Sequence, residues 1–469
     1  MLSVDAILDI GKTNIKLSLF PTDTETSVEV RKLVNRSMQC NAYLAFDTDR
    51  IWSWFIASLT QLSADYDIDR LTVCTHGAAA ALVDDQGLVF AIADYEDRRF
   101  ESLGKAYPRP VFAETYSPAL PAGLNLGRSV HWLAQLDPDR FARVQSILMY
   151  PQYWIWRLTG VACSEVTSLG CHTDFWNPLL GDFSSLVDDC RWRDMFPPLV
   201  KAGALVGRLD PVLATGAHLN PACRVFNGIH DSNASLVPYI LNASGSAVVL
   251  STGTWFILAK LGGVADLTDN GEFFAGHIEE ARDMLLNSNF NGEPVPSSRF
   301  MGGREWQLIN PSGNKDGSWA DVDRLIDMEL SLSPCFAETG GPFPTEMGVV
   351  ELASRALTEV ERSAAATLYI ALMTDYCLSQ LGPVETLYIE GPVSHNRLFI
   401  QLLGCLQTDL KIVASPGTGT STGLLRLMRD QEGVGDPVDM PAESIEGDDV
   451  GLLNYRARWR ADRVKAEKA

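Results

Sequence analysis

A strand, a tight glycine-containing turn and a second strand form the pattern that most constrains how this chain can fold, and the chain carries it twice. At the N-terminus, VDAILDI is followed by GKTN and then by IKLSLF, in which apolar and polar residues alternate. Alternation with a period of two residues is typical of a β-strand. The segment SAVVLSTGTWFILAK at 246–260 repeats the arrangement, with Gly253 in the position of Gly11. The two segments share a pattern rather than a sequence.

Length and charge narrow the class of protein. A chain of 469 residues predicts two or three domains, at roughly 100–200 residues each, and 46% hydrophobic residues suffice for a sizeable core. Lys and Arg number 38 against 59 Asp and Glu, a net charge of −21. This surplus of acid argues against a nucleic-acid or anionic-membrane binder, because both surfaces attract cations. Backbone amides can still hold phosphate locally.

Targeting and cysteine signals favour a cytoplasmic protein. No run of 18 apolar residues occurs, so a transmembrane helix is not expected. The opening MLSVDAILDIGK lacks the basic start of a signal peptide. The nine cysteines include no CxxC pair and predict reduced intracellular thiols. The seven histidines form no HExxH motif, so no structural zinc site is predicted.

A short run of small and polar residues predicts the domain boundary. Small and polar residues, NASGS, separate two apolar runs at 242–246, which divides the chain into domains 1–243 and 244–469. Strands and helices alternate through 359–430. The basic stretch 456–469 reads as a solvated terminal helix, because charge runs usually form exposed faces. A role of this helix in pairing two subunits stays open.

The first polar turn, DIGKTN, invites comparison with a phosphate-binding P-loop. That motif requires a glycine where Ala6 stands, and a helix where strand-like alternation follows Thr13. The P-loop is therefore rejected. Two interpretations remain: a hairpin turn whose donors face phosphate with Asp9 near a divalent cation, or a plain hairpin with a polar turn.

An Asp before a helical pattern is the candidate catalytic residue. In GIHDSNASLVPYI, Asp231 can act as a general base for a substrate hydroxyl, or simply cap the helix. A carboxylate with a near-normal pKa suits phosphoryl transfer, which depends mainly on positioning. His230 is either part of the site or a core histidine.

Two further turns offer ligand contacts. In STGTW, 251–255, a glycine between hydroxyl residues can bring backbone N–H groups to a phosphate, or form an ordinary hairpin. In YIEGPVSHNRLFIQLL, a strand runs into Gly391 and a helix with Asn396 near its start. Strand ends of this kind carry ligands in α/β folds. The alternative is a connection in which Asn396 caps the helix.

The order of these motifs resembles the FGGY family of carbohydrate kinases, in the actin-like ATPase and hexokinase superfamily. The resemblance covers nearly all of 1–430 and rests on DIGKTNIK, GIHD, STGTW, MGGREW, IEGPVSHNRLFIQ, LTVCTHGAAAALVDDQG, IADYEDRR and PQYWIWRLTG. The chain departs from the family where Lys12 replaces a common Thr or Ser, and where Glu390 and Pro392 flank a single glycine. THGA at 75–78 also fits neither the xylulose-kinase nor the glycerol-kinase pattern.

The resemblance implies an α/β fold of two ribonuclease H-like domains, each a mixed sheet flanked by helices, with a cleft between them. It implies sugar binding by the first domain and ATP with Mg²⁺ mainly in the second. The residues implied are Asp231 as base; Asp9 for Mg²⁺; Gly11, Lys12, Thr13, Asn14, Gly253 and Thr254 for phosphates; Gly302, Gly303, Gly391 and Asn396 for the nucleoside; and His76, Gly77, Asp97, Tyr153 and His230 for the sugar.

The implied function is transfer of the γ-phosphate of ATP to a hydroxyl of a small sugar, with a ketose such as L-rhamnulose or L-fuculose favoured. Xylulose, ribulose and glycerol stay open as substrates. Two other classes also stay open: a sensor of the same fold that binds nucleotide and sugar without catalysis, and an actin-like or chaperone ATPase without a sugar. The partners expected are ATP and a sugar, with neither nucleic acid nor membrane, and the subunits could form a homodimer.

Overall fold

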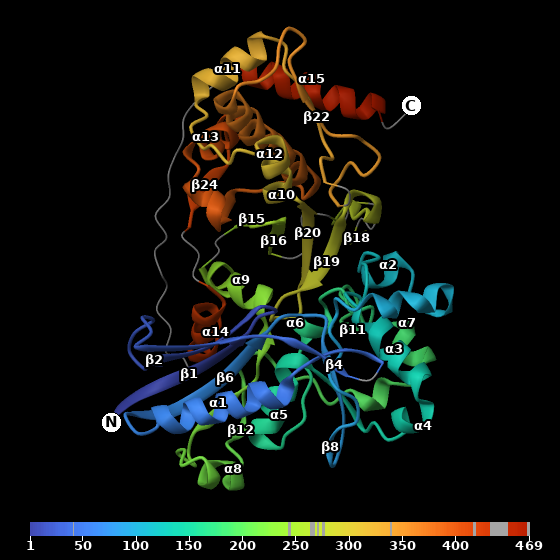
Figure 1. The fold of residues 1–469 in the computed structure, drawn as a ribbon, viewed down its shortest axis with the longest axis vertical. Coiled ribbons are helices and arrows are strands. Elements are labelled where there is room, and N and C mark those ends of the chain that lie inside the picture. The colour runs from blue at the N-terminus through green and yellow to red at the C-terminus, as the bar shows by residue number, and fades with distance from the viewer. Residues whose placement is uncertain are drawn as a thin grey trace. The chain divides into compact units, whose positions relative to one another are not determined.

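Two compact units make up the fold, and the chain passes between them more than once (Figure 1). The computed structural model describes residues 1–40, 42–242, 245–262, 268–269, 272–273, 277–337, 340–415, 419–431 and 449–466. The first unit comprises 1–241, 286–294 and 418–437, and the second comprises 242–285, 295–417 and 438–469. Each unit is therefore built from three separate stretches of the chain rather than from one continuous segment. The predicted boundary at 243/244 lies outside the described residues.

A six-strand path forms the centre of the first unit. Its order is β12 (Leu205–Arg208), β13 (Arg224–Phe226), β6 (Tyr66–Thr75), β1 (Leu2–Ile10), β2 (Asn14–Pro21) and β3 (Glu29–Val34), and the short β14 (Ile229–His230) also pairs with β6. β1 pairs antiparallel with β2 and parallel with β6. The predicted strand–turn–strand unit is thus confirmed at the N-terminus, and the antiparallel pairing explains why a turn as short as 11–13 suffices.

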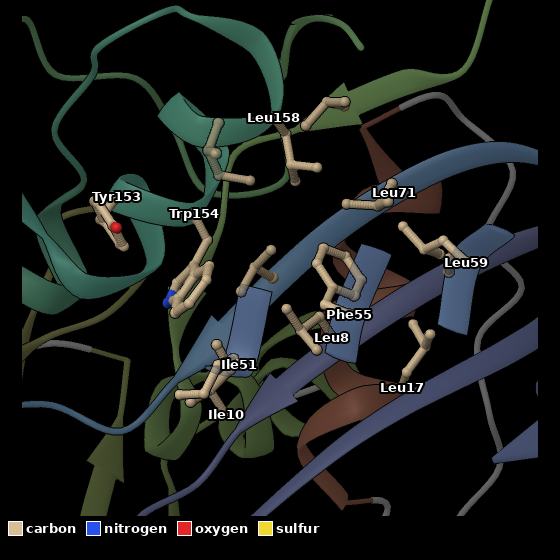
Figure 2. Close-up of a cluster of buried hydrophobic side chains, with 14 of the residues drawn as sticks. Leu8, Ile10, Leu17, Ile51, Phe55, Leu59, Leu71, Tyr153, Trp154 and Leu158 are labelled. Atoms are coloured by element: carbon tan, nitrogen blue, oxygen red, sulfur yellow. The ribbon is translucent and has the colours of Figure 1, made fainter. Parts of the chain in front are cut away.

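Alternation along β1 sends its side chains to two different cores. Val4, Ala6, Leu8 and Ile10 face a core closed by α1 (Thr48–Leu62) and α5 (Tyr150–Thr159), which contribute Phe55, Leu59, Trp154 and Leu158 (Figure 2). Ile7 faces the opposite core, with Cys74 of β6. There α9 (Asp231–Asn242) and α14 (Gly419–Asp430) cover the sheet, as Figure 1 shows. The β1 strand is therefore buried on both faces.

Helix α14 returns to the first unit late in the sequence because it completes this second core. Its Leu424, Leu425, Leu427 and Met428 are fully buried there. Its arginine Arg429 also reaches Asp5, with Nη2 2.8 Å from Oδ2, while Arg70 of β6 binds the same carboxylate. Asp5 is completely buried. A buried carboxylate held by two guanidiniums explains why Asp can occupy the middle of β1.

Additional elements surround these two layers in the first unit. A separate core lies against the β7–β9 sheet and α3, with Phe100, Phe175 and Trp192 among its members. The elements are β4 (Ser37–Cys40), β5 (Tyr43–Phe46), β7 (Ala80–Asp84), β8 (Gly87–Leu88), η1 (Arg98–Ala106), α2 (Phe112–Thr115), α3 (Leu126–Leu136), α4 (Pro138–Phe141), β9 (Ser146–Met149), α6 (Val166–Leu169), β10 (Trp176–Asn177), β11 (Asp182–Phe183), α7 (Ser185–Asp189), η2 (Arg193–Met195) and α8 (Pro211–Gly216).

The second unit repeats the sheet of the first. Its order is β19 (Met284–Ser288), β20 (Pro294–Phe300), β16 (Phe256–Leu261), β15 (Ala247–Thr252), β23 (Thr386–Glu390) and β24 (Lys411–Ala414). β15 pairs antiparallel with β16 and parallel with β23, as β1 does with β2 and β6. The α/β class with two related domains is confirmed, and the repeated sequence pattern corresponds to a repeated topology.

The remaining elements of the second unit include the long buried helix α12 (Glu359–Gln380), of which most residues are inaccessible to solvent. The others are β17 (Thr268–Asp269), β18 (Glu272–Phe273), η5 (Glu280–Arg282), α10 (Gly302–Ile309), α11 (Trp319–Asp327), β21 (Ser331–Ser333), β22 (Val349–Glu351), η6 (Pro392–His395), α13 (Arg397–Leu406) and α15 (Val450–Ala466).

The basic C-terminal helix is packed, contrary to the prediction of a solvated one. In α15, Leu452, Tyr455 and Trp459 are buried. Arg456 and Arg460 bind the carboxylate of Asp375, which lies on α12 and is completely buried. Part of the charge run therefore neutralises an internal carboxylate, which the local sequence cannot reveal because Asp375 is distant in the chain.

The ion cluster around Asp5 provides a test of this packing. Asp5→Ala leaves the guanidiniums of Arg70 and Arg429 buried without their carboxylate. Losing one partner of a buried ion pair typically costs about 3–5 kcal/mol, so we expect a loss of that size in the free energy of unfolding, measured by urea titration at pH 7. Asp188→Ala is the control, because Asp188 is half exposed beside Arg193 and contributes little. Equal effects of the two substitutions would refute the role given to Asp5.

Candidate functional site

The turn between β1 and β2 is held in shape by its own backbone and by Asn35. Gly11 N donates to Asn14 O at 3.0 Å, and Asn35 N donates to Thr13 O at 2.9 Å. The Asn35 side chain also donates to Gly11 O at 2.9 Å. Thr13 and Asn14 are exposed at the surface of this unit. The turn is therefore a fixed polar loop whose Thr13 hydroxyl and exposed edge are accessible to a ligand.

Asp9 lies at the end of β1 beside this turn and is almost completely buried. Its Oδ2 accepts a hydrogen bond of 2.7 Å from the Thr420 hydroxyl of α14, and Lys16 Nζ lies 3.6 Å from the same oxygen. Among the described residues, no group of three or more His, Cys, Asp or Glu side chains is arranged to hold a metal ion. A single carboxylate nevertheless fits Mg²⁺, which keeps several waters and is usually held by one or two carboxylates with substrate phosphates.

Asp231 is the first residue of α9, where β14 ends. Its Oδ1 accepts from Ser232 N at 2.6 Å and from the Ser232 hydroxyl, and His230 Nε2 lies 3.3 Å from it. Within the described ranges all of these partners are on Oδ1, which leaves Oδ2 available to a proton. Burial, with a contribution from the charge of Asp9, raises the pKa of Asp231 to about 6. The expected near-normal pKa is therefore corrected upward.

The neighbouring imidazole orients this carboxylate. His230 Nδ1 lies 3.4 Å from the amide nitrogen of Asn233, which donates to it, so the ring proton is on Nε2 and faces Asp231. Burial lowers the pKa of His230 to about 4, so the ring is neutral at pH 7. A Cβ on Gly77 would lie 2.9 Å from His230 Nε2. The predicted residues Gly77, His230 and Asp231 therefore lie together.

Behind this pair, two buried residues fix the backbone of His230. Its N–H donates to the hydroxyl of Thr167 at 3.1 Å, and that hydroxyl donates to Glu165 Oε2 at 2.6 Å. Burial raises the pKa of Glu165 to about 7. The sequence analysis missed both residues, because a Glu that caps a short helix and a Thr within it carry no local signal of a contact with residue 230.

His76 is packed among aromatic rings of the first unit. Its ring centroid is 4.8 Å from that of Phe46, 5.4 Å from that of Tyr95 and 5.1 Å from that of Tyr150. Its Nδ1 lies 2.8 Å from Gly77 O, so Nδ1 carries the proton. Burial lowers the pKa of this imidazole. Its buried Nε2 is thus an acceptor, and it has no hydrogen-bond partner within the part of the chain that the structure describes.

The Lys12 ammonium lies beside two of the same rings. Its ammonium forms an ion pair with Asp94 and lies 3.1 Å from Glu96 Oε2. It also lies 5.0 Å from the centroid of Phe46 and 4.8 Å from that of Tyr95. The sequence prediction placed Lys12 on phosphate, whereas the structure gives its charge two carboxylate partners.

Two residues expected to contact sugar have hydrogen-bond partners within the first unit. Asp97 accepts from Leu44 N at 2.7 Å and binds Arg99, and it caps η1. Tyr153 is buried in the core beneath β1 (Figure 2), with its hydroxyl 3.2 Å from Arg157. The missed residues nearer His76 are Tyr95 and Tyr150, and Asp94, which binds Lys12. The segment IADYEDRR signals this loop, but a pattern cannot decide which of its acids pairs with Lys12.

In the second unit, the expected nucleotide residues meet at the end of β15. Gly253 N donates to Trp255 O at 3.0 Å, and Arg304 N donates to Thr254 O at 3.4 Å. A Cβ on Gly303 would lie 2.0 Å from Gly253 O, so only glycine permits this approach of α10. The structure therefore brings Gly302, Gly303, Gly253 and Thr254 together.

The turn after β23 packs against Thr252 at the end of β15. Gly391 has φ of +83°, and a Cβ there would lie 2.2 Å from Thr252 O. The Thr252 hydroxyl donates to Glu390 O and accepts from Val393 N. Asn396 caps α13, its Oδ1 accepting from Phe399 N at 3.1 Å, so the helix-cap interpretation describes what it does here.

Two further observations bear on the sequence predictions. All nine cysteines lie in the described ranges and are thiols rather than disulfides. Within those ranges, no helix is both long and apolar enough to cross a bilayer.

Comparison with known proteins identifies two consecutive family domains in the chain. Residues 5–238 match the N-terminal domain of the FGGY family of carbohydrate kinases, and 244–436 match the carbohydrate kinase FGGY C-terminal domain. A solved structure, a carbohydrate kinase from Novosphingobium aromaticivorans, is 34% identical with a TM-score of 0.89, and the match covers 99% of each chain.

Curated relatives are more distant. An L-fuculokinase of Salmonella typhi is 26% identical over 282 residues, which span 55% of this chain and only 57% of that protein. A rhamnulokinase of Oceanobacillus iheyensis is 21% identical over 427 residues, spanning 85% of this chain and 86% of that one.

The two imidazoles provide a direct test of the site. At pH 7 we expect both His76 and His230 to be neutral and in opposite tautomers, with the proton on Nδ1 of His76 and on Nε2 of His230. Long-range ¹H–¹⁵N correlation spectra of histidine-labelled protein report the tautomer of each ring, and His76→Gln and His230→Gln variants assign the signals. A charged His230 at pH 7 would disprove the orientation given to Asp231.

Proposed function

The chain belongs to the FGGY family of carbohydrate kinases, and we propose that it transfers the γ-phosphoryl group of ATP to a hydroxyl of a small sugar, a ketose such as L-rhamnulose or L-fuculose. The observation that carries the proposal is Asp231, a largely enclosed carboxylate with one oxygen held by Ser232 and His230 and the other available. The names of the L-fuculokinase and rhamnulokinase relatives favour a ketose.

Asp231 is the proton acceptor in this proposal. The substrate hydroxyl oxygen forms a bond to the γ-phosphorus, the bond from that phosphorus to the β–γ bridging oxygen breaks, and ADP leaves. The hydroxyl proton passes to Oδ2 of Asp231. A pKa near 6 suits this task, because the group is ionised at pH 7 yet basic enough to accept a proton. Neutral His230 keeps Oδ1 oriented without adding a charge.

The two glycine turns are the proposed phosphate contacts. Thr13, Asn14 and the backbone at Gly11 serve this role in the first unit, and Gly253 and Thr254 serve it in the second. The proposed nucleoside contacts are Gly302, Gly303, Gly391 and Asn396. The three glycines lie around the end of β15, and Asn396 follows Gly391 in the chain. Asp9 would hold Mg²⁺, which supplies positive charge to the phosphates of bound ATP. The Thr420 hydroxyl keeps the Asp9 carboxylate oriented.

Two other activities of this fold give different outcomes. A sensor would bind nucleotide and sugar without product, and an ATPase without a sugar would hydrolyse ATP regardless of added sugar. The free oxygen of Asp231 favours the kinase over both, because neither alternative requires a base for a substrate hydroxyl.

Removal of the proposed base tests the function. Asp231→Ala should lower kcat about 10²–10⁴-fold, the range of general-base catalysis, while ADP affinity stays within about twofold. Sugar phosphate formation is measured across ketoses, aldoses and polyols, and ADP binding is measured by calorimetry. Asp188→Ala is the matched control, because it removes an exposed carboxylate in the same unit. Near-normal kcat in Asp231→Ala would rule out this role.

The pH dependence tests the same carboxylate independently. The pKa of Asp231 is raised to about 6, so its ionised fraction falls as pH drops through 6. We expect kcat/KM to be level from pH 7 to 8 and to decrease about tenfold for each unit below 6. A far-UV circular dichroism spectrum that stays the same between pH 7.5 and 4.5 excludes acid unfolding as the cause. A rate that stays level down to pH 4.5 would contradict this assignment.

A further inference from the structure

Lys12 occupies a place that the phosphate interpretation does not explain. It belongs to the β1–β2 turn, but its ammonium is drawn to Asp94 and Glu96 of the loop after β8. Four-fifths of its side chain is covered, and Asp94 is almost completely buried. A charge held by two carboxylates and two aromatic faces loses much of its interaction energy if it leaves them.

The carboxylate that binds Lys12 is itself fully engaged. Asp94 Oδ1 accepts from Lys12 and from Glu96 N at 3.0 Å, and Oδ2 accepts from the Ser37 hydroxyl. Hydrogen bonds from Lys12 and Ser37 hold the pKa of Asp94 below its usual value against the opposing effect of burial. Asp94 therefore anchors the ammonium in a fixed place. An ammonium has three N–H donors, so Lys12 retains donor capacity beyond its two carboxylates.

His76 supplies a hydrogen-bond acceptor beside the Lys12 donor. The rings of Phe46 and Tyr95 contact both the Lys12 ammonium and the His76 imidazole. His76 Nε2 is buried, is unprotonated and has no hydrogen-bond partner among the described residues. A buried acceptor without a donor is destabilising. It is therefore suited to accept from a hydroxyl that arrives with the substrate.

The charge of this cluster distinguishes classes of sugar. Lys12 carries one positive charge, whereas Asp94 and Glu96 carry two negative charges. The charge of Asp231 also acts on His76 and on Tyr95. A substrate carboxylate would meet a net negative environment in a partly buried place, where like charges repel strongly. Neutral hydroxyls can accept from Lys12 and donate to His76 without that penalty.

We propose that Lys12 is a specificity-determining residue of the sugar site rather than a phosphate ligand, and that the site formed by Lys12, Asp94, Glu96 and His76 selects an uncharged polyhydroxy sugar over a sugar acid. This inference rests on the proposed function and specifies its substrate class. One sugar hydroxyl oxygen accepts from the Lys12 ammonium, and another hydroxyl donates to His76 Nε2.

The test separates sugar binding from nucleotide binding. The probes are L-fuculose and L-rhamnulose as neutral ketoses, D-gluconate as a sugar acid, and ATP with Mg²⁺. In Lys12→Met we expect KM for the accepted ketose to rise at least tenfold and KM for ATP to change less than twofold. Lys12→Arg keeps the charge and should restore part of the ketose affinity. Wild-type enzyme should use D-gluconate at least 100-fold less efficiently than the ketose.

A double variant guards against misfolding, because Lys12→Met alone leaves Asp94 buried without its cation. Lys12→Met/Asp94→Asn removes both charges, and it should fold like the wild type, as judged by its melting temperature, while still losing ketose affinity. A tenfold rise in KM for ATP with unchanged KM for the ketose would overturn the inference and place Lys12 on phosphate. Efficient use of D-gluconate by the wild type would also overturn it.

Calorimetry without turnover distinguishes this inference from the proposed function. If a ketose binds the wild type and binds Lys12→Met at least tenfold more weakly, the inference holds even when no sugar is phosphorylated, and only the proposed function fails. If none of the three sugars binds the wild type, the inference is refuted.

Discussion

The buried carboxylate of Asp5 fixes the register on which the rest of the first unit depends. It is held by Arg70 within the sheet and by Arg429 at the end of α14. At the start of the same helix, Thr420 binds Asp9. From Asp5 to Asp9 the strand spans about 13 Å, and from Thr420 to Arg429 the helix rises about 13–14 Å. The two lengths agree, so the ion cluster at one end keeps the Thr420 hydroxyl on Asp9 at the other.

The same sheet face also carries the proposed base. Helices α9 and α14 share one core with Ile7 and Cys74, so Asp231 at the start of α9 and Asp9 at the end of β1 lie on one side of the sheet. Their proximity has an electrostatic effect, because the charge of Asp9 contributes to the raised pKa of Asp231. The second unit repeats the pairing of the central strands, and there the backbone around Gly303 and Gly391 packs closely against the end of β15.

The sequence predicted features that depend on neighbouring residues and missed those that depend on distant ones. Alternation in IKLSLF and VVLSTGTWFILAK located both strand–turn–strand units, and GIHD located a carboxylate at a helix start. The direction of Lys12 was not predictable, because Asp94 becomes its neighbour only through the fold. Tyr150 and Tyr153 lie on one helix, and only the packed structure shows that Tyr150 is the one beside His76. The docking of α15 likewise requires Asp375, which no local pattern connects to it.

The passage of the chain between the units has a consequence for how the protein is made. The first unit lacks helix α14 until residues 419–430 have been synthesised, although the strands of its central sheet are synthesised much earlier. Until then Asp5 has Arg70 but not Arg429, and the apolar face formed by Ile7 and Cys74 lacks the part of its cover that α14 provides. The second unit waits for Arg456 and Arg460 to neutralise Asp375. The first unit therefore cannot reach its final packing before α14 has been synthesised, and the second unit cannot do so before α15 has been.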